Sequence, residues 1–209
     1  MSPNKGIPMN KTPSRTVEQA ISVAIAVVLI SCFSTYVQAS SADVTTTQTK
    51  QQAEANILAQ IELHKVKIRE LELKKFAEQR TPFTDEELAQ MLSAVGFEGK
   101  ALRVAWAVVK KESNGRPLAF NGNSRTGDSS YGIFQINMIG GLGVARRDKY
   151  DLKTNTELFD PVVNAEIAYQ MTGAGDDWSS WKVGSGYNGK DQARFLDWYK
   201  KFPEGVKLS

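Results

Sequence analysis

The chain has 209 residues, of which 41% are hydrophobic and 23% charged, and this ordinary globular composition excludes a wholly disordered protein. The formal net charge is only +3, so we expect no nucleic-acid partner, because the chain lacks the excess of basic residues that phosphate binding needs. A single cysteine and a single histidine exclude a disulfide framework, a cysteine zinc cluster and a histidine-rich metal site. We therefore expect neither a metal ion nor another cofactor.

Residues 1–39 have the pattern of an export signal or membrane anchor. Lys5, Lys11 and Arg15 precede the almost wholly apolar run at 20–30. Basic residues before an apolar segment favour a cytoplasmic N-terminus and transfer of the following chain across the membrane. We therefore expect the protein to be attached to the membrane of the cell envelope, with its C-terminal domain in the periplasm or outside the membrane.

The end of this segment leaves three alternatives open. Extended to Val37, the apolar segment reaches the length of a spanning helix. Val37-Gln38-Ala39 also fits a signal-peptide cleavage site. The run Leu29-Ile30-Ser31-Cys32 resembles a bacterial lipobox, in which Cys32 would carry the lipid.

A linker and a long helix are predicted between this segment and the C-terminal domain. Residues 40–52 are small and polar, whereas 53–79 contain no glycine or proline and are rich in Glu, Lys, Leu and Ile. Apolar residues recur there at alternating spacings of four and three, with one histidine among them: Ile57, Ile61, His64, Ile68 and Leu71. This seam indicates an amphipathic helix that could self-associate as a weak coiled coil. Because Pro82 ends the helical pattern, we expect the domains 1–39, 40–82 and 83–209.

Four helices are predicted in residues 83–209. Thr84 and Glu87 form a capping-box pattern before the first helix, and Asp160-Pro161 combines an N-cap with a first-turn proline before the third. The expected ranges are 85–95, 100–112, 161–171 and 191–202. No set of alternating strands is visible, so the sequence predicts a mainly α domain with minimal β structure.

Glu112 is the first candidate for chemistry. It ends an apolar helix and precedes a loop rich in glycine and asparagine, so its carboxyl group is expected to project into a cleft from a rigid support. The negative end of the helix dipole disfavours an ionised carboxylate there. Lys110 and Lys111 point in other directions around an ideal helix, so we expect that they need not neutralise Glu112. A carboxylic acid that keeps its proton can protonate a glycosidic oxygen.

Four short motifs follow Glu112 in an order that resembles a known enzyme family. They are Glu112-Ser113, Tyr131-Gly132-Ile133-Phe134-Gln135, Asp160-Pro161 with Asn164, and Tyr187-Asn188-Gly189. Together they resemble the soluble lytic transglycosylase and goose-type lysozyme family over residues 83–201. No single motif is specific for this family, but the four motifs in this order are.

The resemblance implies a lysozyme-like fold that cuts the β-1,4 bond between N-acetylmuramic acid and N-acetylglucosamine in peptidoglycan. It implies that Glu112 acts as the general acid and then as the general base. The residues that it implies at the substrate are Ser113, Gly132, Gln135, Asn137, Tyr187 and Asn188. Tyr187 is expected near Glu112 or the muramic acyl group, and Gly132 in the floor of the groove.

Two reactions remain open. A hydrolase needs a second carboxylate, whereas a lytic transglycosylase uses the 6-hydroxyl of its own sugar. Goose-type lysozymes have aspartates around the motif at 131–135, whereas position 137 is asparagine here. Asp128 is the possible second carboxylate, and the alternative is that Asp128 only forms a turn. We therefore predict a lytic transglycosylase, with a hydrolytic muramidase as the alternative. A cellular and a phage, virion-associated origin are both open, as is a non-catalytic glycan-binding or assembly protein.

Overall fold

The computed structural model describes residues 45–123, 125–184 and 186–206. The chain divides into two compact units, Met1–Ile61 and Glu62–Ser209. The predicted membrane segment at 1–39, with Cys32, lies outside the described residues. Among the residues that are described, no helix is both long and apolar enough to cross a bilayer.

Helix α2 covers Thr45–Ala77 and begins earlier than the sequence predicted. The predicted linker at 40–52 is therefore wrong from Thr45 onward. Residues 45–52 contain neither glycine nor proline, so nothing in them stops a helix that the following strong helix formers propagate. Ile61 and Leu71 of the predicted seam are 40% and 59% exposed, and self-association through this helix stays a prediction.

The last turns of α2 belong to the compact unit that begins at Glu62. Phe76 is buried and packs against Phe83, with 6.0 Å between the ring centroids. The Arg69 guanidinium donates to the carbonyl oxygens of Ala94 and Val95. These contacts tie residues 62–77 of α2 to the rest of this unit.

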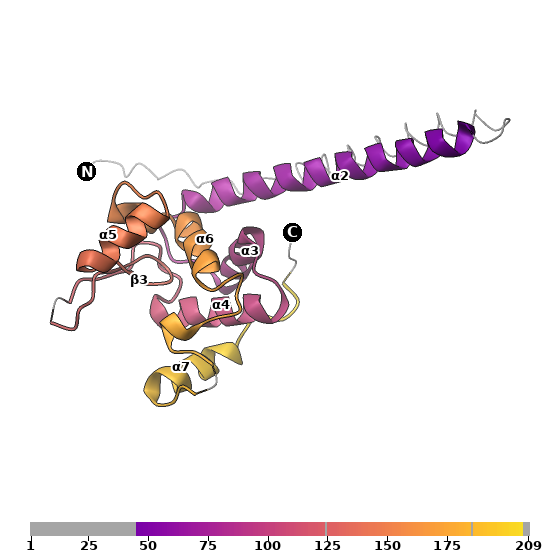
Figure 1. Ribbon diagram of the computed structural model, residues 1–209. Coiled ribbons are helices and arrows are strands. Elements are labelled where there is room, and N and C mark those ends of the chain that lie inside the picture. The colour runs from indigo at the N-terminus through magenta and orange to yellow at the C-terminus, as the bar shows by residue number, and fades with distance from the viewer. Residues whose placement is uncertain (1–44, 124, 185, 207–209) are drawn as a thin grey trace, which may run out of the picture. The chain divides into compact units, whose positions relative to one another are not determined.

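Helices α3 (Asp85–Val95) and α4 (Gly99–Glu112) form the centre of this unit. The Thr84 hydroxyl accepts from the Glu87 backbone N–H, and the Glu87 carboxylate accepts from the Thr84 N–H, which completes the predicted capping box. The backbone hydrogen bond from Thr84 holds the pKa of Glu87 below its usual value, although partial burial opposes this. Figure 1 shows α4 with α3 against one side and α7 against another.

The C-terminal part consists of short helices. They are α5 (Gly140–Lys149), η1 (Asn155–Phe159), α6 (Pro161–Met171), η2 (Ser179–Trp181) and α7 (Lys190–Tyr199). The Asp160 carboxylate accepts from the N–H groups of Val162 and Val163, as the N-cap prediction requires. The last predicted helix is too long at its end, because the structure ends α7 at Tyr199 and places Phe202 against Trp106.

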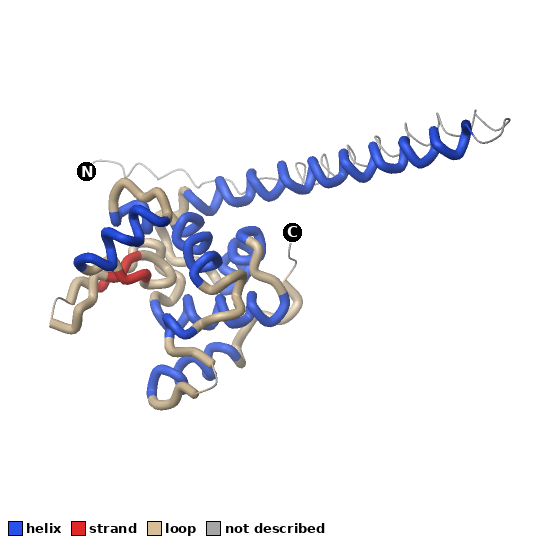
Figure 2. Tube along the Cα trace, in the orientation of Figure 1, coloured by secondary structure: helices blue, strands red, loops and turns tan. Residues whose placement is uncertain are grey.

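A small antiparallel sheet carries the loop that follows α4. Its strands β1 (Phe120–Asn121), β2 (Ser130–Tyr131) and β3 (Ile136–Asn137) pair in chain order. Figure 2 shows them as one small red patch in a mainly helical unit. The predicted mainly α fold with minimal β structure is confirmed.

Candidate active site

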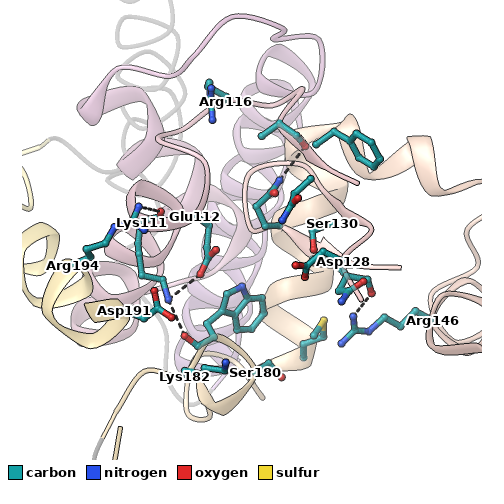
Figure 3. Close-up of a pocket in the computed structure, with 18 residues that line it drawn as sticks. Lys111, Glu112, Arg116, Asp128, Ser130, Arg146, Ser180, Lys182, Asp191 and Arg194 are labelled. Carbon is teal, nitrogen blue, oxygen red and sulfur yellow. Dashed lines mark hydrogen bonds and ion pairs between the residues drawn. The ribbon is translucent and has the colours of Figure 1, made fainter. Parts of the chain in front are cut away.

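Glu112 lies in an open cleft of about 890 Å³ in the unit 62–209. The end of α4, the small sheet, η2 and α7 all contribute to its lining. In Figure 3, Glu112 and Lys111 lie on one side of the cleft, and Asp128, Ser130 and Arg146 lie on the other. Eight of the fourteen residues of the helix that supports Glu112 are buried, so the carboxylate projects from a rigid platform, as the sequence predicted.

Lys111 holds the Glu112 carboxylate in this position. Its Nζ lies 2.9 Å from Glu112 Oε1 and donates to the backbone oxygen of Trp181 at 2.9 Å. The Lys111 side chain is only 5% exposed, against 26% for Glu112. The expectation that Lys111 need not neutralise Glu112 is therefore wrong. Its long, flexible side chain bends toward the helix end, where the carbonyl groups favour a cation.

The carbonyl groups at the end of α4 have a second cationic partner. Arg194 on α7 donates through Nη2 to the backbone oxygen of Lys111 at 3.1 Å. This bond connects α7 with the helix end that carries Glu112, and it satisfies a carbonyl that has no partner within the helix. The Trp181 indole donates to Phe134 O at 2.7 Å, which fixes the side of the cleft that Lys111 contacts.

The opposite wall contains three of the predicted residues. Asp128 lines the cleft, and its Oδ2 accepts from the Thr126 hydroxyl at 2.6 Å. Gln135 donates to the backbone oxygens of Ala119 and Gly132, and its φ is +51°. Asn137 accepts from the Ser129 and Ile139 N–H groups and donates to Gly127 O. Gln135 and Asn137 therefore shape the wall, and their amide groups are already engaged by the protein.

Gly132 and Ser113 lie behind the cleft surface. A Cβ on Gly132 would lie 2.1 Å from Leu158 O and 2.3 Å from Asn164 Nδ2. The glycine is needed for this close approach and not for contact with a glycan, which corrects the expected place in the groove floor. Ser113 is buried, and its hydroxyl donates to Val109 O in the preceding helical turn.

Asn164 lies on α6 and holds the turn between β2 and β3. Its Oδ1 accepts from Phe134 N, and its Nδ2 donates to Tyr131 O and Leu158 O. The side chain is fully buried, and all three bonds are 2.9–3.0 Å long. This residue of the Asp160-Pro161 motif is therefore a positioning element for the cleft wall.

Tyr187 and Asn188 are not brought to Glu112. The Tyr187 hydroxyl donates to Ser179 O at 3.4 Å, and the ring lines a separate cavity of about 790 Å³ with Trp178 and Tyr199. Asn188 is exposed and does not line the cleft. The expected contact between Tyr187 and Glu112 is thus absent among the described residues, because the chain before α7 turns toward η2.

Phe134, Trp178 and Trp181 form an aromatic group beside the cleft, and most of it belongs to the core. Phe134 is fully buried, and Trp178 stacks on it with 6.3 Å between ring centroids. Trp181 is as buried as Trp178, at 7% exposed, but it differs in that it lines the cleft. It is the member of this group that a bound sugar could reach.

Several cleft residues were missed by the sequence reasoning. The charged residues among them are Lys111, Arg116, Arg146, Lys182, Asp191 and Arg194. Charged residues in loops and short helices are usually solvated, so their types alone gave no signal. Within the described ranges, no group of three or more His, Cys, Asp or Glu lies close enough together to hold a metal ion.

Comparison with known families agrees with this geometry. A family model described as a lysozyme-like domain matches residues 89–183. This chain contains a lysozyme-like domain. The match runs from within α3 to just beyond η2, so it includes Glu112, Asp128 and Trp181 of the cleft. No curated protein and no solved structure matches the chain significantly.

A lysozyme-like domain is typical of glycosidases and transglycosylases that act on peptidoglycan. The resemblance recognised from the four motifs is therefore confirmed at the level of the family. Five residues of the motifs or the cleft lie outside the matched range: Tyr187, Asn188, Gly189, Asp191 and Arg194.

Proposed function

We propose that this protein cleaves peptidoglycan glycan strands as a lytic transglycosylase, with Glu112 as its single catalytic residue. One observation carries the proposal: the Glu112 carboxylate is partly exposed in a large cleft, at the end of a buried helix of the lysozyme-like domain. A general acid must be held in place and still be reachable by the glycosidic oxygen. Glu112 meets both conditions.

The reaction needs one proton donor that later accepts a proton. Glu112 first gives its proton to the oxygen of the leaving N-acetylglucosamine, and the bond from that oxygen to C1 of N-acetylmuramic acid breaks. The carboxylate then takes the proton of the muramic 6-hydroxyl as this oxygen bonds to C1, so a 1,6-anhydro end forms and no water is consumed. Lys111, at 2.9 Å, stabilises the carboxylate between the two steps.

The contacts of the opposite wall favour this reaction over hydrolysis. One oxygen of Asp128 accepts from Thr126, within a local turn. Asn137, which cannot act as a base, has its amide group bonded to the backbone. A muramidase remains the second candidate, because Asp128 does line the cleft across from Glu112 (Figure 3) and could hold a water molecule.

Product analysis tests the proposal. The full chain is incubated with purified sacculi, and the released fragments are measured by mass spectrometry. We expect the wild-type protein to release fragments with 1,6-anhydromuramic ends. Glu112→Gln should release at least about 99% less, because the amide keeps the shape of the side chain but cannot donate a proton to the leaving oxygen. Reducing ends would favour the muramidase. Near-normal release by a folded Glu112→Gln protein would overturn the role of Glu112. No release by the wild-type protein would leave a non-catalytic glycan-binding function.

We also propose that residues 1–39 bring the domain to its substrate by exporting it and attaching it to the membrane. The support is the sequence pattern of three basic residues before an uncharged apolar run. Peptidoglycan lies outside the cytoplasmic membrane, so an enzyme that acts on it has to cross that membrane.

A further inference from the structure

Arg146 is a half-buried cation in the wall of the cleft opposite Glu112. It comes from α5 and points toward Asp128 and the cleft, as Figure 3 shows. Its Nη1 donates to the backbone oxygen of Asn137. Among the described residues, this is the one hydrogen bond that the Arg146 side chain makes to protein. No described carboxylate lies within ion-pair distance of its guanidinium.

This guanidinium has unused capacity for an anion. An arginine offers five N–H donors in a planar fork that fits a carboxylate. Burial lowers the pKa of Arg146 from its usual value, and the Tyr150 phenol offsets this only in part. A cation that has lost water without gaining a counter-charge gains most when an anion arrives.

The charge of the whole cleft favours the same kind of ligand. Five basic and three acidic side chains line it, although the chain as a whole is close to neutral. Lys111 is paired with Glu112, so the remaining basic side chains of the lining, which include Arg146, outnumber the remaining acidic ones. A cleft for an uncharged glycan would have no need of this excess.

We propose that Arg146 is a subsite for a carboxylate carried by the glycan strand, which makes this enzyme selective for strands with peptide substituents. The peptides attached to the lactyl group of N-acetylmuramic acid carry free carboxylates, whereas the sugar backbone is uncharged. The inference rests on the proposed function, since it names the form of peptidoglycan that the same cleft accepts. Arg146 binds substrate here and takes no part in bond cleavage.

The test compares two substrates that differ only in charge. One is peptide-bearing glycan freed of phosphodiester polymers with hydrofluoric acid, and the other is the same material with its carboxylates amidated by carbodiimide and ammonia. The full-length protein is compared with Arg146→Gln and Arg146→Lys. The matched control is Arg147→Gln: Arg147 is the next residue of α5, its guanidinium donates to Asn155 Oδ1 at 2.6 Å, and it does not line the cleft.

We expect the wild-type protein to cleave the carboxylated glycan about tenfold more efficiently than the amidated glycan. Arg146→Gln should lose this preference through a higher KM for the carboxylated substrate, Arg146→Lys should keep part of it, and Arg147→Gln should retain it. Equal cleavage of both substrates by the wild type would overturn the subsite. So would an equal loss on both substrates in Arg146→Gln, because that would indicate a structural role.

A binding measurement separates this inference from the proposed function. Calorimetry with a muramyl-peptide fragment and its amidated form is carried out on the wild type and on Arg146→Gln. If the protein cleaves neither glycan yet binds the carboxylated fragment about tenfold more tightly than the amidated one, through Arg146, the proposed reaction fails and the subsite stands. If it cleaves glycan and binds both fragments equally, the subsite fails and the reaction stands.

Discussion

Two adjacent lysines at the end of α4 face different surroundings. Lys111 bridges Glu112 Oε1 and Trp181 O from a buried position. Lys110 pairs with Asp85 at 2.8 Å and lies over the Trp198 ring at 4.8 Å, away from the cleft. The pair therefore provides a matched comparison, in which one substitution removes a contact with the Glu112 carboxylate and the other does not.

We predict that Lys111→Met lowers kcat about tenfold or more and changes KM less than about twofold. Without Lys111 the carboxylate loses the contact that holds and stabilises it, whereas the sugar-binding surface remains. Steady-state kinetics on soluble glycan fragments measures the two constants. Lys110→Met should keep its kcat and lose about 1 kcal/mol of stability at most. Equal losses of kcat in both variants would argue that Lys111 only stabilises the fold.

Asp128 distinguishes the two candidate reactions. Its Oδ2 accepts from Thr126 Oγ1 at 2.6 Å, and asparagine can accept the same bond through its amide oxygen. We predict that Asp128→Asn loses less than about tenfold in activity and still gives anhydro products. A general base for water contributes about 10²–10⁴-fold, so a loss above about a hundredfold with an unchanged melting temperature would make Asp128 catalytic.

The residues of the site were partly predictable. Glu112, Gln135 and Asn137 stand in or beside the family motifs, and the structure does place them in the cleft lining. Lys111 and Arg146 were not foreseen. Whether a lysine bends to its neighbour or an arginine becomes half-buried depends on chain segments that come together only in three dimensions, such as η2 behind Lys111 and β3 beside Arg146.

At the scale of elements, the turn between β2 and β3 depends on Gly132. Its φ is +72°, and a Cβ at this position would lie only 2.1 Å from Leu158 O, which leaves no room for a side chain. Gly127 has the same φ of +72° but nothing within 4 Å of its Cβ position. The two glycines therefore share the backbone requirement and differ only in packing.

We predict that Gly127→Ala costs about 1 kcal/mol of stability, as expected for an alanine with positive φ. Gly132→Ala adds steric overlap with a backbone carbonyl and with Asn164, so its cost should exceed that of Gly127→Ala by about 1–3 kcal/mol. Urea unfolding of both variants measures the difference. Similar midpoints for the two would show that the turn can move away from η1 and α6.

The starts of two helices were predicted from their N-caps. The capping box of α3 and the Asp160 N-cap of α6 each rest on a local hydrogen bond, so residue types alone reveal them. Helix α5 was missed: it begins Gly140-Gly141, has no side-chain N-cap bond and buries only Gly143. The strands have two residues each, too few for an alternating pattern to appear.

For the whole molecule, we predict that membrane attachment depends on residues 17–38 and not on the helix at 45–61. Deletion of 17–38 should release the protein from the membrane fraction, because this deletion removes the apolar run. Deletion of 45–61 should leave attachment intact and serves as the control. Fractionation followed by immunoblotting gives the distribution, and release by the second deletion alone would contradict the prediction.

Cys32→Ala then separates the modes of attachment. Loss of lipid labelling together with release from the membrane would identify a lipoprotein. Retention without any lipid label would identify a spanning anchor. A mature chain that begins at Ser40 would show that the segment is a cleaved signal.

The position of Trp181 also has an optical consequence. Of the four tryptophans, Trp106 and Trp198 pack against each other and Trp178 lines the other cavity, whereas Trp181 lines the cleft. The environment of its indole should therefore change when a saccharide enters. Fluorescence emission from the folded Glu112→Gln protein would report the occupancy of the cleft directly, without a label on the sugar. Loss of the response in Trp181→Phe would assign the signal to this indole.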